Sequence, residues 1–311
     1  MRILVVGAGA IGGYFGGRLL EAKQDVTFLV RPRRAAELAS SGLQIQSRFG
    51  DVKLSKPPTV LAEDLHSTFD LILLSCKAYD LDSAITSFAP AVGPRTVIMP
   101  LLNGMRHLDV LDQRFSPAQV LGGLCVISSV LETGGRVVHL NELHLLSFGE
   151  RDGSRSARTE AISSAFSGSR FVTRLSDNIL QEMWEKWVFI ATCAGITCLM
   201  RASVGEIVSA GAADLATTLM SECAAIAASQ GFVPSPASIR QTQSLLTAPG
   251  SGMTASMFRD IERRGPIEAD HMIGNLLHRG EKKGIDSPLL RVAYAHLKAY
   301  EARRARETAQ V

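Results

Sequence analysis

Residues 2–17 read RILVVGAGAIGGYFGG, and they carry the clearest structural signal in the first half of the chain. A short apolar run, typical of a buried strand, leads directly into the spacing GxGxxG, and an amphipathic helical pattern follows. In this context Gly7 permits a tight turn, Gly9 lets the backbone approach a pyrophosphate, and Gly12 lets the helix pack on the strand. The stretch therefore predicts a dinucleotide-binding turn between a strand and a helix.

The predicted helix begins inside the glycine turn, and its first backbone N–H groups have no partner within the helix. In the predicted site the turn and the helix start, including Ala10 and Ile11, bind the phosphate groups of the dinucleotide. The alternative interpretation is a glycine-rich turn that holds no ligand.

The end of the second predicted strand indicates which dinucleotide binds. In NAD-binding proteins an Asp or Glu stands about 20 residues after the glycines and accepts hydrogen bonds from the ribose hydroxyls. Arg31 holds that place here, and a guanidinium group matches the geometry of a 2′-phosphate. The sequence therefore predicts NADPH rather than NADH. Arg33 and Arg34 follow closely, and a solvated helix face is the alternative for at least one of them.

Strand and helix patterns alternate from residue 1 to about residue 130, which predicts an α/β unit with a parallel, doubly wound sheet. The predicted strands of this sheet are residues 3–6, 26–30, 71–75, 97–101 and 120–126. Residues 136–150 alternate apolar with polar side chains and predict one or two added antiparallel strands. A last strand is expected at 171–175.

The second half of the chain has the pattern of long helices. The expected windows are 155–166, 178–200, 212–230, 236–247, 254–263, 266–283 and 288–306. We therefore predict two domains: a Rossmann-type NADP-binding domain at 1–175 and an all-α substrate and catalytic domain at 176–311. The charged tail at 301–311 is expected to fray.

Composition narrows the class of partner. Thirty-three Lys and Arg against thirty Asp and Glu give a formal net charge of +3, which argues against a nucleic-acid or membrane partner and favours a small molecule. The five cysteines have neither metal nor disulfide spacing, which predicts a reducing, cytoplasmic setting. Cys193 and Cys198 could be read as a redox pair, but core packing is favoured. No metal is predicted, because no histidine has ligand spacing.

Two polar residues follow predicted strands at the edge where open α/β sheets bind ligands. Lys77 follows one of these strands and Asn103 follows the next. Each of them taken alone could be a surface residue or a turn former.

Together these motifs resemble the ketopantoate reductase family, the NADPH-dependent 2-dehydropantoate 2-reductases. The resemblance covers nearly the whole chain in order. Its motifs are the glycine pattern at 7–12, Arg31, Cys76–Asp80, Leu102–Gly104, Trp184–Lys186 and Ser256–Asp260 followed by Ile267 and Glu268.

The resemblance implies a fold like that of 6-phosphogluconate dehydrogenase and the reduction of ketopantoate to pantoate, as in pantothenate biosynthesis. It implies that Lys186 protonates the substrate carbonyl oxygen and that Glu268 interacts with the lysine, the substrate and the cofactor region. It also assigns Ser256 to the substrate carboxylate, Asn103 to the nicotinamide and substrate, and Lys77 to the cofactor and active-site region.

Simpler interpretations exist for three of these residues. Lys186 could extend to solvent from an amphipathic helix, and Glu268 could be a first-turn acid that complements a helix dipole. Ser256 could cap a helix. The resemblance, not the spacing, favours catalytic and binding roles for them.

The chain also departs from the family pattern. One and two helical turns after the lysine the family has asparagines, where this chain has Ile190 and Ala194. Leu102 stands where a glutamine is common. We therefore expect an apolar pocket wall and a substrate that is ketopantoate or another branched, more apolar 2-oxo acid.

Two other functions stay open from the sequence. One is a different dehydrogenase of the 6-phosphogluconate-dehydrogenase-like superfamily that acts on another oxo or hydroxy acid. The other is a non-catalytic NADPH-binding protein. A monomer and a homodimer are equally compatible with the sequence.

Overall fold

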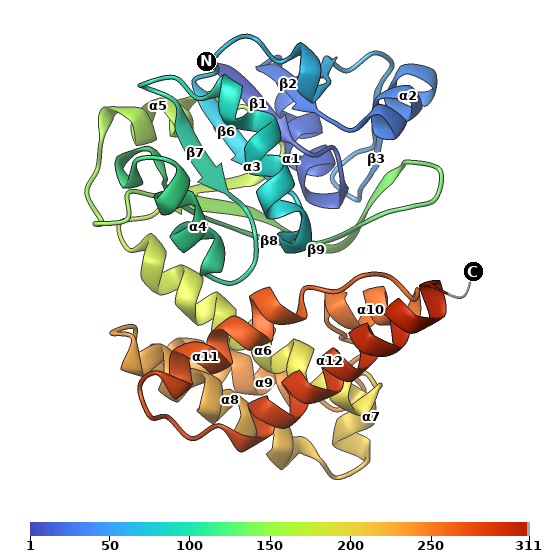
Figure 1. Cartoon of the computed structure of the whole chain (residues 1–311), viewed down its shortest axis with the longest axis vertical. Coiled ribbons are helices and arrows are strands. Elements are labelled where there is room, and N and C mark those ends of the chain that lie inside the picture. The colour runs from blue at the N-terminus through green and yellow to red at the C-terminus, as the bar shows by residue number, and fades with distance from the viewer. Residues whose placement is uncertain (310–311) are drawn as a thin grey trace. The chain divides into compact units, whose positions relative to one another are not determined.

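The computed structural model describes residues 1–309, and the chain divides into two compact units (Figure 1). The first unit comprises Met1–Leu102 and His107–Leu180. The second comprises Asn103–Arg106 and the chain from Gln181 onward. A short loop from the first half of the chain thus belongs to the second unit.

The first unit contains a parallel five-stranded sheet with the strand order β5-β2-β1-β6-β7. Its strands are β1 (Arg2–Val6), β2 (Asp25–Leu29), β5 (Thr59–Val60), β6 (Leu71–Leu74) and β7 (Val97–Pro100). The central strands are buried on both faces, which explains their nearly continuous apolar sequence. This arrangement confirms the predicted doubly wound α/β fold, although the short strand β5 was not predicted.

A second sheet lies in the same unit, and it corrects one expectation. Residues 120–126 were expected in the parallel sheet, but β8 (Gly122–Leu131) pairs antiparallel with β9 (Val137–Gly149). The two form a long green hairpin in Figure 1. Only an isolated bridge between Ile98 and Val120 continues the parallel sheet, because the chain then turns into the hairpin. The other strands of the second sheet are β3 (Leu43–Gln46), β4 (Val52–Leu54) and β10 (Val172–Leu175).

Helix α1 (Ala10–Glu21) packs against both sheets, and its glycines make this possible. A Cβ atom added at Gly16 would lie 2.6 Å from the Phe28 ring of the parallel sheet. A Cβ atom added at Gly17 would lie 2.6 Å from the Ile45 side chain of the second sheet. The glycine-rich sequence of α1 therefore lets one helix approach two sheets closely.

The remaining helices of the first unit are shorter. They are α2 (Pro32–Ser41), α3 (Leu81–Phe88), α4 (Arg106–Arg114, which begins in the second unit) and α5 (Ala157–Phe166), with single turns at η1 (Ala62–Asp64), η2 (Ala78–Asp80), η3 (Ala89–Ala91) and η4 (Pro117–Gln119).

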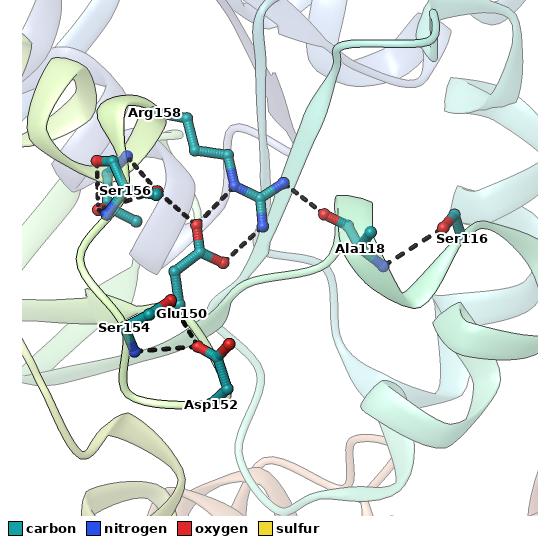
Figure 2. A network of polar contacts seen from close by, with 8 residues as sticks. Ser116, Ala118, Glu150, Asp152, Ser154, Ser156 and Arg158 are labelled. Atoms are coloured by element: carbon teal, nitrogen blue, oxygen red, sulfur yellow. Dashed lines mark hydrogen bonds and ion pairs between the residues drawn. The ribbon is translucent and has the colours of Figure 1, made fainter.

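A polar network joins α5 and η4 to the end of β9 (Figure 2). Arg158 on α5 donates from Nε and Nη2 to the two carboxylate oxygens of Glu150, at 2.7 and 2.5 Å, and from Nη1 to the carbonyl oxygen of Ala118. Ser156 donates to the same carboxylate at 2.5 Å. The Arg158 guanidinium is the main cause that holds the pKa of Glu150 below its usual value. The network fastens the end of β9 to α5 and η4.

The second unit is helical. Its elements are α6 (Ile179–Met200), α7 (Val204–Ser209), α8 (Ala213–Ser229), α9 (Pro236–Leu246), α10 (Ser256–Glu262), the π-helical turn η5 (Asp270–Gly274), α11 (Asn275–Glu281) and α12 (Pro288–Thr308). The long predicted helices are present, whereas α7 was not predicted. Helix α12 continues through Thr308, so the expectation of a frayed tail from residue 301 is wrong as far as the described chain goes. Residues 310–311 lie outside the described residues.

The apolar run of α6 forms part of the core of the second unit. Trp187, Ala191 and Ile196 are completely buried. Across residues 1–309, no helix has both the length and the apolar character needed to cross a membrane.

Candidate functional site

The glycine turn has the backbone geometry that the sequence predicts. Gly7 follows β1 with a φ of +93°, in the left-handed region that favours glycine, and its N–H donates to the carbonyl oxygen of Leu29 at 3.0 Å. Helix α1 begins at Ala10, with Gly9 as its N-cap residue. A Cβ atom added at Gly12 would lie 2.0 Å from the Gly7 carbonyl oxygen. Glycine is therefore the one residue that fits at position 12.

The outer side of the turn suits a phosphate group. A Cβ atom added at Gly9 would meet nothing within 4 Å among the described residues, and Gly9, Ala10 and Ile11 are partly exposed. Within residues 1–309, no side chain caps the start of α1. The first amides of a twelve-residue helix therefore point to a surface that a pyrophosphate can approach.

Three side chains fasten the turn from outside it. Ser75 Oγ donates to the carbonyl oxygens of Val6 at 2.9 Å and Gly7 at 3.1 Å. Arg34 Nε donates to the carbonyl oxygen of Ala8 at 3.0 Å, and Ser129 Oγ donates to that of Ala10 at 3.1 Å.

Ser75 and Ser129 were not predicted as residues that hold the turn. The strand register holds a signal for Ser75, because Leu74 pairs with Val6 and the next residue therefore lies beside the turn. No such signal points to Ser129, since β8 belongs to the other sheet.

The arginines after β2 differ in their environments. Arg31 is exposed over 70% of its side chain, and its Nη2 lies 2.6 Å from Asp80 Oδ1, which raises the pKa of Arg31. Arg33 is exposed over 92% of its side chain, whereas Arg34 is only 13% exposed and holds the glycine turn. Arg31 and Arg33 are thus accessible from solvent, whereas Arg34 holds the turn.

The ion pair of Arg31 links it to the Cys76–Asp80 motif. Lys77 is half-buried and is the N-cap residue of η2 in this motif. The structure thus gathers the glycine turn, Arg31 and Lys77 at the carboxyl ends of β1, β2 and β6 in the first unit.

Lys186 and Asn103 meet in the second unit. Lys186 lies on α6, half-buried between the buried Trp184 and Trp187. Its Nζ donates to Asn103 Oδ1 at 2.9 Å, across 83 residues of sequence. The ammonium group is therefore held at a defined position beside the Asn103 amide.

The π-helical turn η5 supports both partners of this hydrogen bond. A Cβ atom added at Gly104, whose φ is +77°, would lie 3.2 Å from the His271 ring, so the Asn103 loop packs closely on η5. Trp187 Nε1 donates to the carbonyl oxygen of Met272 at 2.9 Å, which joins α6 to the same turn.

Glu268 and Ser256 lie in the same unit. Glu268 is half-buried just before η5, and its carbonyl oxygen accepts from the N–H of Met272 at 2.9 Å. Ser256 is exposed at the first position of α10, where Ala255 rather than Ser256 is the N-cap residue. The roles of both residues remain predictions.

The departures from the family pattern lie on α6 beyond Lys186. Ile190 is half-buried and Ala194 is 2% exposed. Neither side chain can donate or accept a hydrogen bond.

The buried thiols further along α6 do not add a nucleophile. Burial raises the pKa of Cys193 and of Cys198 to about 12, so both stay protonated at neutral pH. In the described part of the chain, no group of three or more His, Cys, Asp or Glu residues could hold a metal ion.

A parallel sheet with a glycine turn at its first strand, followed by a helical unit that carries a fixed lysine, defines a class of Rossmann-type oxidoreductases with two units. The model of ketopantoate reductase PanE/ApbA matches residues 3–153, and the C-terminal model of the same family matches residues 178–301. The chain belongs to the ketopantoate reductase family.

Individual relatives agree with this assignment. The chain is 39% identical to the uncharacterized oxidoreductase YkpB of Bacillus subtilis, over 97% of this chain and 99% of that protein. The crystal structure of 2-dehydropantoate 2-reductase from Geobacter metallireducens superposes with a TM-score of 0.88 at 27% identity, covering 96% of this chain and 99% of that one. A D-mandelate dehydrogenase has the same fold, with a TM-score of 0.88 at 22% identity, covering 98% of this chain and all of that one (100%). The fold alone therefore does not define the substrate.

Proposed function

We propose that the chain uses NADPH to reduce a 2-oxo acid to the 2-hydroxy acid, the substrate being ketopantoate or a closely related branched 2-oxo acid. The observation that carries this proposal is the hydrogen bond between Lys186 Nζ and Asn103 Oδ1, at 2.9 Å, in a member of this family. The name of the Geobacter metallireducens relative, 2-dehydropantoate 2-reductase, supports the substrate class.

The reaction needs a hydride at C2 of the acid and a proton on its carbonyl oxygen. Bound NADPH supplies the hydride from C4 of its nicotinamide. The Lys186 ammonium group stabilises the negative charge that develops on the oxygen and then donates a proton from Nζ. Asn103 orients the ammonium group, Glu268 favours its charged form, and Ser256 binds the carboxylate of the acid.

The residues of the first unit fit the cofactor. The glycine turn and the start of α1 would hold the pyrophosphate, because the surface at Gly9 is open and the first amides of α1 carry no side-chain cap within residues 1–309. Arg31 would bind the 2′-phosphate, with Lys77 in the same region. Asp80 holds the Arg31 guanidinium from one side and so limits the orientations it can adopt.

The choice of cofactor is tested by replacing Arg31 with alanine. We expect the Kd for NADPH to rise about 10- to 100-fold, because a charge-assisted hydrogen bond to the 2′-phosphate is lost. The Kd for NADH should change little, since NADH has no 2′-phosphate. Arg95→Ala is the matched control, because Arg95 is exposed and lies at the amino end of β7, away from the predicted phosphate site. Equal losses for both cofactors would show that the 2′-phosphate binds elsewhere.

The face of α6 beyond Lys186 carries the apolar residues Ile190 and Ala194, which favours an apolar substrate. Because Ile190 offers no hydrogen bond, the hydroxyl group of ketopantoate gains less there than it would from an asparagine. Burying a polar group without a hydrogen-bond partner costs about 1–3 kcal/mol of binding free energy. We therefore expect 2-oxoisovalerate, which lacks this hydroxymethyl group, to compete well with ketopantoate.

This substrate preference is tested with Ile190→Asn. The ratio of kcat/KM for ketopantoate to that for 2-oxoisovalerate should rise about 10-fold relative to the unaltered enzyme. Ile190→Leu keeps an apolar side chain of similar volume, and it should leave the ratio unchanged. An unchanged ratio in Ile190→Asn would place the substrate hydroxyl away from this helix face.

A further inference from the structure

Arg259 is a charged residue of the second unit that the sequence analysis did not assign. It lies on α10, three residues after Ser256, so the two residues share one face of the helix. Ser256 is exposed and Arg259 is half-buried. A guanidinium group thus stands beside the serine that the proposed function assigns to the substrate carboxylate.

The guanidinium uses only part of its hydrogen-bonding capacity. Its Nη1 donates to the carbonyl oxygen of Thr254 at 3.0 Å and contacts Thr254 Oγ1 at 3.4 Å. Among residues 1–309, Nε and Nη2 of Arg259 have no protein acceptor, and the group forms no ion pair with a carboxylate. Nε and Nη2 make up the edge of a guanidinium that binds a carboxylate through two parallel hydrogen bonds.

The electrostatic environment shows a charge that the protein does not fully compensate. Burial lowers the pKa of Arg259, and the nearby Asp260 carboxylate opposes this effect only in part. Arg263 lowers the pKa further. An arginine remains charged under these conditions, so a bound anion would be stabilised here.

The position of Arg259 relates it to Lys186. Cys193 on α6 lies close enough to the guanidinium to influence the pKa of Arg259. Cys193 follows Lys186 by two helical turns and lies on the same face of α6. Thr197 Oγ1 also accepts from the N–H of Ala255 at 3.4 Å, which fastens the start of α10 to α6. Two helical turns after Lys186, the same side of α6 therefore lies next to the segment that carries Arg259.

We propose that Arg259 binds the carboxylate of the 2-oxo acid through Nε and Nη2, beside Ser256, while Thr254 holds Nη1. This assignment rests on the proposed function, because it takes a 2-oxo acid as the ligand. It makes Arg259 the residue that selects an acid over an uncharged ketone.

The test measures binding of oxamate, a carboxylate that resembles a 2-oxo acid but is not reduced, to the protein saturated with NADP⁺. Calorimetric titration should show that Arg259→Ala weakens oxamate about 100-fold. Arg259→Lys keeps the positive charge but cannot form two parallel hydrogen bonds to a carboxylate, so the affinity for oxamate should fall about 10-fold. Arg240→Ala removes an exposed arginine of helix α9 in the same unit and should leave the affinity unchanged.

A second measurement separates a binding role from a structural one. In Arg259→Ala, kcat/KM for a 2-oxo acid should fall about 100-fold, whereas kcat/KM for its uncharged methyl ester should change less than about 2-fold. Equal effects on acid and ester, or oxamate affinity that is independent of Arg259, would overturn the assignment. If the enzyme reduced no 2-oxo acid but bound oxamate through Arg259, the proposed function would fail and the carboxylate site would stand.

Discussion

Replacing Lys186 with alanine is expected to lower kcat about 100-fold or more while the protein still binds NADPH with unchanged affinity. The reason is that Lys186 Nζ is held by Asn103 Oδ1 at 2.9 Å, as a positioned acid requires. Without it, a developing alkoxide has neither a neighbouring positive charge nor a proton donor. Steady-state rates and the fluorescence of bound NADPH measure the two effects separately.

Two variants serve as controls for the Lys186 experiment. Lys283→Ala removes an exposed lysine of the same unit and should leave kcat unchanged. Lys186→Arg keeps the positive charge but is a far weaker proton donor, so it should recover only part of the lost rate. Turnover that is unaffected in Lys186→Ala would remove Lys186 from the chemistry.

The second large effect concerns the glycine turn, where two neighbouring glycines should respond differently. Gly9→Ala is expected to abolish measurable NADPH binding without unfolding the protein. The new methyl group meets nothing within 4 Å among the described residues, and the Gly9 backbone is extended with a negative φ of −85°. It would occupy the space that the pyrophosphate needs.

Gly12→Ala should instead destabilise the fold. Its methyl group would lie 2.0 Å from the Gly7 carbonyl oxygen and 2.2 Å from Ser75 Oγ. We expect the free energy of unfolding to fall by about 3 kcal/mol or more, as in severe overpacking. Thermal and denaturant unfolding measure this loss.

Gly134→Ala is the matched control for both glycine variants. A Cβ atom at Gly134 also meets nothing within 4 Å among the described residues, and Gly134 lies in the turn between β8 and β9. It should change neither stability nor NADPH binding. If Gly9→Ala bound NADPH as tightly as Gly134→Ala, the cofactor would not approach the turn.

The parts of the fold that the sequence predicted are those whose signal is local. The glycine pattern and the apolar strand before it define the turn at Gly7 by spacing alone, and Arg31 follows from its place at the end of β2. Long helices such as α6 could also be predicted, because helical spacing of apolar residues that continues over many residues rarely arises by chance. The short strand β5 carries too few residues for such a pattern.

The parts that could not be predicted depend on contacts between distant segments. Residues 120–126 look like a strand of the parallel sheet, and only the antiparallel pairing with β9 reveals that β8 belongs to the second sheet. The hydrogen bond between Lys186 and Asn103 joins residues 83 positions apart. The family resemblance pointed to both residues, and Asn103 also follows a predicted strand, whereas no pattern in the sequence pointed to Lys186. Arg259 lies inside the Ser256–Asp260 motif, but the resemblance assigned a role to Ser256 alone.

The most direct test of the whole account is the oxidation of NADPH by the purified protein in the presence of a panel of 2-oxo acids that includes ketopantoate and 2-oxoisovalerate. We expect saturable turnover of at least one branched 2-oxo acid, with NADPH strongly preferred over NADH. A protein that binds NADPH but turns over none of these acids would contradict the assignment as a 2-oxo acid reductase.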